Sequence, residues 1–220
     1  MAIAFFDLDR TLLSVNSGAL WVKKELREGS ITRLQAVRAF GWIVKYQLGF
    51  GKMEDALLTA IRHLEGKEEA LMRARTHAFW DEEVAHAIRP GAIGALDAHR
   101  QAGDTLVLLT SSSNYLSEKA VEALKLDDFL ATRFEVDAGG HYTGLPMGTL
   151  CYGAGKLTHA RAFATARCTA LKDCAFYTDS ASDLSVMWEV GKPVAVNPDP
   201  RLRRTANRQG WAIEDWGEHA

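Results

Sequence analysis

The 220-residue chain carries 26 Lys and Arg residues against 28 Asp and Glu residues, so its formal net charge at pH 7 is −2. This balance argues against a nucleic-acid partner or an acidic membrane surface, because proteins that bind either of these carry an excess of basic residues. Hydrophobic residues make up 47% of the chain, yet no stretch approaches the roughly 18 apolar residues of a membrane span. We therefore expect a globular protein with no stable membrane association.

The cysteines indicate a reducing environment. Cys151, Cys168 and Cys174 are odd in number and lack CxxC spacing, which speaks against both a disulfide framework and a zinc site. The sequence therefore predicts a cytoplasmic protein. It does not predict the oligomeric state.

The first predicted strand is the short apolar run 2–6, and a helical module follows it. Residues 17–88 contain no convincing strand, and their apolar residues recur at helical spacing. Thr32 and Gln35 have the spacing of a capping box. The aromatic residues expected in the core of this module are Trp21, Trp42, Tyr46, Phe79 and Trp80.

Strands and helices alternate in the rest of the chain. Apolar runs predict strands at 105–109, 174–177 and 193–196, with a further strand within 129–136. Helical patterns cover 92–101, 116–124, 156–164 and 183–190. This alternation predicts a Rossmann-like α/β fold, with a parallel sheet and helices on both of its faces. Residues 1–16 and 89–220 would form this core, and 17–88 would form an inserted α-helical cap.

Polar residues follow the predicted strands, at the edge of the sheet where ligands bind in open α/β folds. The first strand is followed by DLDRT, which contains Asp7 and Asp9, and the second by Thr110. Lys156 begins a helix after the Gly-rich YGAGK, and a later strand leads into TDSASD. Carboxylates gathered in this way repel one another unless positive charge lies among them. Lys156 and a hard divalent cation would supply that charge.

This set of groups suits phosphoryl transfer. A carboxylate can attack phosphorus and form an aspartyl phosphate, while a second carboxylate moves the proton of the leaving group. Mg²⁺ can offset the repulsion between the nucleophile and the phosphate. The sequence thus predicts an enzyme that acts on a small-molecule phosphomonoester.

The order DxDxT, hydroxyl, Lys and DxxxD resembles the haloacid dehalogenase-like (HAD) hydrolases, and most of all their phosphoserine phosphatase-like subgroup, subfamily IB. The helical insertion and the stretches TGLPMGTLCYGAGK and VAVNPDPRLRRTANRQGWAI are similar to that subgroup. The resemblance implies that Asp7 is the nucleophile and Asp9 the general acid and base. It also implies that Thr110 hydrogen-bonds the phosphoryl group and that Lys156 neutralises it.

The resemblance further implies a magnesium cofactor. Asp7, the backbone carbonyl of Asp9 and Asp179 would bind Mg²⁺, and Asp183 would act through water or by orienting Lys156. Ser111 and Ser112 would donate backbone N–H groups near the phosphate.

Three positions depart from the family pattern or bear on the substrate. Arg10 replaces a more usual Gly at the mouth of the site, and Thr178 stands where Gly often precedes Asp179. Asn16 stands where phosphoserine phosphatases carry a Glu that receives the substrate ammonium. An amide provides no charge-assisted contact there, so phosphoserine is expected to be a poor substrate.

Other functions on the same fold stay open at this point. A phosphotransferase would pass the phosphoryl group to an acceptor alcohol instead of water, and the cap would decide between the two. A non-catalytic phosphometabolite-binding protein would not need to keep the nucleophile. A receiver-type signalling domain has no helical insertion of this size.

Overall fold

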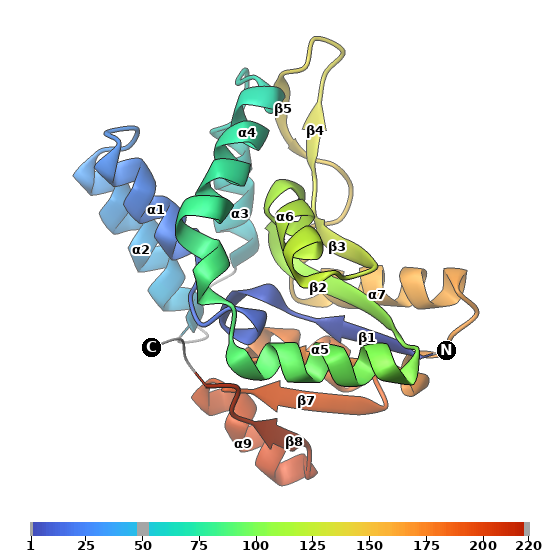
Figure 1. The fold of residues 1–220 in the computed structure, drawn as a ribbon. Coiled ribbons are helices and arrows are strands. Elements are labelled where there is room, and N and C mark those ends of the chain that lie inside the picture. Colours follow the sequence, from blue (N-terminus) through green and yellow to red (C-terminus); the bar gives the residue numbers. More distant parts are fainter. Residues whose placement is uncertain (1, 48–52, 218–220) are drawn as a thin grey trace.

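A computed structural model of the chain describes residues 2–47 and 53–217 (Figure 1), with the side chains of 42–47, 53, 54 and 56 outside the description. Its main sheet has six parallel strands in the order β3-β2-β1-β6-β7-β8. The strands are β1 (Ile3–Phe6), β2 (Thr105–Ser113), β3 (Asp128–Thr132), β6 (Ala175–Thr178), β7 (Lys192–Val196) and β8 (Ala212–Glu214). The predicted α/β fold with a parallel sheet is therefore confirmed.

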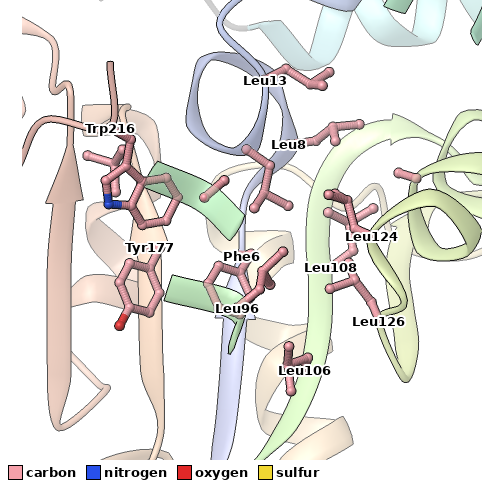
Figure 2. Close-up of a cluster of buried hydrophobic side chains, with 14 of the residues drawn as sticks. Phe6, Leu8, Leu13, Leu96, Leu106, Leu108, Leu124, Leu126, Tyr177 and Trp216 are labelled. Carbon is pink, nitrogen blue, oxygen red and sulfur yellow. The ribbon is translucent and has the colours of Figure 1, made fainter. Parts of the chain in front are cut away.

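Successive side chains of each strand point to opposite faces of the sheet, and both faces are buried under hydrophobic clusters. Phe6 of β1 packs on one face in a cluster with Leu96, Tyr177 and Trp216, which Figure 2 shows together. Phe5 points to the other face, where it packs in a second cluster. The helices that cover the two faces are α5 (Pro90–Ala102), α6 (Asn114–Leu124), α7 (Ala154–Ala166), α8 (Leu184–Met187) and α9 (Pro200–Gln209).

In the described residues, four α-helices lie between β1 and α5 and stand together beside the sheet (Figure 1). They are α1 (Ser17–Arg27), α2 (Arg33–Gln47), α3 (Met53–Arg62) and α4 (Glu69–Phe79). Thr32 and Gln35 form the predicted capping box: Gln35 Oε1 accepts from Thr32 N at 2.8 Å, and Thr32 Oγ1 accepts from Gln35 N at 3.3 Å. Within the described residues, no helix is long and apolar enough to cross a membrane.

The aromatic residues of this helical insertion do not all lie where they were predicted. Phe79 and Trp80 are buried in the same cluster as Phe6. They therefore pack the C-terminal end of α4 onto the sheet and do not form a separate core of the insertion. Trp21 contacts Phe79 edge-to-face, with ring centroids 5.1 Å apart. Trp42 and Tyr46 lie outside the described side chains.

The further strand predicted within 129–136 is confirmed as β3, but the same stretch also holds a second strand that was not predicted. The chain forms β3 in the main sheet and then β4 (Phe134–Val136), which pairs antiparallel with β5 (Tyr142–Pro146). This hairpin reaches the helical insertion, because Tyr142 N donates to Lys67 O at 3.0 Å and Gly66 N donates to Tyr142 O at 2.9 Å. The predicted helix 183–190 is also shorter, since α8 ends at Met187.

Candidate active site

Asp7 and Lys156 form a buried ion pair at the carboxyl end of the central strand β1. Lys156 Nζ lies 2.7 Å from Asp7 Oδ1 and 2.8 Å from Asp183 Oδ2. The exposed fractions are 6% for Asp7, 3% for Lys156 and 1% for Asp183. Residues far apart in sequence thus meet as one charged cluster at the edge where the motifs placed them.

A glycine allows Lys156 to reach this position. Lys156 lies in the first turn of α7, and a Cβ on the preceding Gly155 would stand 2.0 Å from the carbonyl oxygen of Leu150. Only a residue without a side chain permits that approach. The Gly-rich segment therefore sets where α7 begins and where Lys156 points.

Asp9 lies two residues beyond Asp7 and is held from two sides. Its Oδ1 accepts the backbone N–H of Ser17 at 2.6 Å, and its Oδ2 accepts the hydroxyl of Ser112 at 3.1 Å. Burial raises the pKa of Asp9, and these hydrogen bonds counteract part of that rise. Because Ser17 begins α1, the first helix of the insertion directly contacts this carboxylate.

Asp179 follows β6, and its carboxylate has no hydrogen bond or ion pair within the described residues. The residue is 8% exposed, and its backbone N–H donates to Thr11 Oγ1 at 3.0 Å. Burial first, and then Asp7 and Asp183, raise the pKa of Asp179 well above its ordinary value. A cation beside Asp179 would favour the charged carboxylate and lower this pKa.

The carboxylates of the cluster outnumber its ammonium group, so the charge balance favours a bound cation. Burial raises the pKa of Asp7 to about 7, with Lys156 lowering it and Asp183 raising it further. Burial also opposes the charge of Lys156, but Asp183 and Asp7 hold its pKa well above the ordinary value. One ammonium therefore stands among the four carboxylates of Asp7, Asp9, Asp179 and Asp183.

These donors fit a hard divalent cation that takes few protein ligands. Within the described residues, no group of three or more His, Cys, Asp and Glu side chains could hold a metal. The predicted Mg²⁺ ligands do not require such a group. They comprise only two side chains, the carboxylates of Asp7 and Asp179, together with the backbone carbonyl of Asp9. Oxygen donors completed by water are usual for Mg²⁺.

The other predicted site residues have different environments. Thr110 is buried, and its Oγ1 accepts from Ser112 N at 3.2 Å. Ser111 is half-buried in β2, which runs on to Ser113 instead of ending at residue 109 as predicted. Arg10 is exposed, and its charge lowers the pKa of Asp179.

The backbone and the helix ends account for two of the unusual residues. Arg10 has φ +61°, in the left-handed region that favours glycine, so the more usual Gly has a conformational basis. Asn16 is the N-cap of α1, where its Oδ1 accepts from Ala19 N at 2.8 Å. The cap thus occupies one lone pair of Oδ1 and fixes the orientation of the amide at the start of α1.

Three residues without a predicted role hold the site together. Thr11 fixes the backbone before Asp179, Ser17 binds Asp9, and Thr178 Oγ1 donates to Asp183 Oδ2 at 2.7 Å. Thr11 belongs to the DxDxT motif, which could have indicated it. The other two contacts join residues close in sequence, eight apart for Ser17 and Asp9 and five apart for Thr178 and Asp183, and they depend on how the turn between the two residues folds.

We expect the free energy of unfolding of the metal-free protein to fall as the pH rises from about 4 towards about 7. The folded-state pKa of Asp7 is about 7, against an ordinary value of 3.8. Between these values the folded state binds more protons than the unfolded state, so stability decreases with increasing pH. Urea unfolding in EDTA across this range measures the effect. Asp7→Asn should make the profile less steep, with Asp9 and Asp179 supplying the remaining slope, and an unchanged slope in that variant would contradict the assignment.

The chain is similar to several known proteins. The family model of the haloacid dehalogenase-like hydrolases matches residues 4–187. The chain is 32% identical to phosphoserine phosphatase SerB1 of Mycobacterium tuberculosis, over 98% of this chain and 71% of that protein. It is 27% identical to histidinol-phosphatase of Neisseria meningitidis, over 96% and 97%. A crystal structure of a protein with unknown function from Bordetella pertussis Tohama I has a TM-score of 0.87 and 27% identity, covering 98% of this chain and 99% of that one.

The fold and the matched motifs define an enzyme class. The chain belongs to the haloacid dehalogenase-like hydrolases, as its motifs predicted. Several of its relatives are named as phosphatases, so the predicted enzyme class is confirmed as well.

Proposed function

We propose that the protein hydrolyses the phosphate monoester of a small alcohol through a phosphorylated Asp7, with Mg²⁺ as its cofactor. The observation that carries this proposal is the buried contact of Asp7 with Lys156, with Asp9 held two residues away. A carboxylate nucleophile, an ammonium and a second carboxylate at one strand end are the groups that two-step phosphoryl transfer needs.

In the first step, a carboxylate oxygen of Asp7 forms a bond to phosphorus, and the bond between phosphorus and the alcohol oxygen breaks. Asp9 donates the proton that the leaving alcohol takes up, and burial supports this role because it raises the pKa of Asp9. In the second step, Asp9 accepts a proton from the water that attacks phosphorus. Phosphate leaves, and Asp7 regains its carboxylate.

The remaining residues stabilise charge and position the phosphoryl group. Lys156 places an ammonium beside the nucleophilic carboxylate, and Thr110 with the backbone N–H of Ser111 would bind phosphoryl oxygens. The N–H of Ser112, predicted for the same task, instead donates to Thr110 Oγ1. Asp7, Asp179 and the carbonyl of Asp9 would hold Mg²⁺. When bound, this ion offsets the repulsion between the carboxylates and the phosphate dianion.

The insertion would control access to the site. We propose that residues 17–88 act as a cap over the core formed by 1–16 and 89–220, and that Ser17 couples the cap to Asp9. Whether water or an acceptor alcohol reaches the phosphorylated Asp7 decides between a hydrolase and a phosphotransferase. The relatives that are named phosphatases favour a hydrolase, in which water is the acceptor.

The assay that tests this function is phosphate release from an aryl phosphate, with and without chelation. We expect EDTA to abolish turnover and Mg²⁺ to restore it, because neighbouring carboxylates without a cation repel a phosphate dianion. Full activity after thorough chelation would contradict the proposed cofactor. Release of phosphate without any hydroxyl acceptor separates a hydrolase from a phosphotransferase.

The site also bears on the substrate. Asn16 is uncharged, and one lone pair of its Oδ1 already caps α1, so it compensates a substrate ammonium less well than a carboxylate would. We expect kcat/KM for phosphoserine to lie at least about tenfold below that of the best uncharged alcohol phosphate in a panel. Histidinol phosphate belongs in the panel because of the Neisseria relative.

The matched variant for this test is Asn16→Asp, which keeps a capping oxygen and adds a charge. We expect it to narrow the gap between phosphoserine and the best alcohol phosphate. A wild-type preference for phosphoserine would show that another acidic group receives the ammonium.

A further inference from the structure

Thr178 is the last residue of β6, and its hydroxyl has a fixed orientation. The side chain is fully buried, with Oγ1 2.7 Å from Asp183 Oδ2 and 3.2 Å from Ser180 N. A backbone N–H can only donate, and the carboxylate of Asp183 accepts. The hydroxyl proton of Thr178 therefore goes to Asp183, while its oxygen accepts from Ser180.

The oxygen that Thr178 contacts is the same one that binds Lys156. Asp183 Oδ2 lies 2.8 Å from Lys156 Nζ, which in turn lies 2.7 Å from Asp7 Oδ1. Three hydrogen bonds thus join Thr178 to Asp7, and all four side chains are more than nine-tenths buried. Buried networks of this kind fix the geometry of their members, because no water can replace a lost partner.

We propose that Thr178 is a positioning residue, which acts through Asp183 to hold the ammonium of Lys156 against Asp7. The inference rests on the proposed function of this site. Without the hydroxyl, Asp183 keeps Lys156 and a longer contact from Ser182 Oγ, which lies 3.4 Å from Asp183 Oδ1. The carboxylate can then turn about its side-chain bonds, and Lys156 can follow it. The ammonium would then be displaced from the carboxylate that attacks phosphorus.

Two variants separate the hydroxyl from the shape of the side chain. Thr178→Val keeps the size of the residue and removes the donor, whereas Thr178→Ser keeps the donor. We expect Thr178→Val to lower kcat about tenfold, as for a lost hydrogen bond to a charged group. We expect KM to change less than about twofold, and Thr178→Ser to stay within about twofold of the wild type in both constants. Thr178→Ala removes the same hydroxyl, and serves where Thr178→Val does not fold.

A double-mutant cycle tests whether the effect passes through Asp183. In an Asp183→Asn background, whose residual activity is the reference, we expect Thr178→Val to cost less than about twofold. The same loss in both backgrounds would assign Thr178 to the turn at Ser180 and overturn the proposal. So would wild-type kcat in both Thr178→Val and Thr178→Ala, or an equal loss in Thr178→Ser. If the wild type releases no phosphate from any ester, the proposed function itself fails, independently of the variants.

Discussion

Asp7→Asn is expected to lower kcat by on the order of 10⁴-fold or more, because an amide cannot form the phosphorylated intermediate. The fold should persist, since Asn has the shape of Asp and Lys156 keeps its contact with Asp183. Steady-state phosphate release and circular dichroism measure the two effects.

Asp173→Asn is the matched control for this variant, because Asp173 is exposed and lies outside the site. It should retain wild-type activity. Turnover in Asp7→Asn within about tenfold of the wild type would exclude Asp7 as the nucleophile.

Lys156→Met is expected to damage both stability and activity. The substitution keeps the apolar stem but removes the ammonium, which leaves the buried carboxylates of Asp7 and Asp183 without their partner. Breaking a buried ion pair in this way costs about 3–5 kcal/mol, and kcat should fall about 10²- to 10³-fold with the loss of a charge-stabilising donor. Urea unfolding and phosphate release measure these losses.

The loss of stability should depend on pH. In the variant the carboxylates can protonate at low pH, so the cost should be larger near pH 8 than near pH 6, in the direction that the raised pKa of Asp7 gives. Lys192→Met removes an exposed ammonium, and should change the free energy of unfolding by less than about 0.5 kcal/mol. An equal effect of the two substitutions would contradict the role of Lys156.

The central strands could be predicted from sequence because both faces of a parallel sheet are apolar. β1, β6 and β7 are continuous hydrophobic runs, and they were predicted to within about two residues. The short elements carry a weaker signal. β8 has three residues, and β4 follows β3 so directly that the two read as one strand, although Gly139 and Gly140 mark the turn of the hairpin.

The motifs predicted which residues lie at the strand ends but not which atoms meet there. Asp7, Lys156 and Asp183 come together because parallel strands end at one edge of the sheet. The choice of Ser112 as the partner of Asp9 depends on β2 continuing past residue 109. The apolar pattern of a strand cannot show this, because the residues that extend β2 are polar.

The central claim is that a phosphoryl group is transferred to Asp7, and trapping the intermediate tests it most directly. Borohydride reduces an acyl phosphate to an alcohol, so an aspartyl phosphate becomes homoserine, which mass spectrometry locates in the sequence. Protein quenched during turnover should carry homoserine at position 7, and the Asp7→Asn variant should carry none. A phosphoryl group found on Ser111 or Ser112, or homoserine at another position, would contradict the account.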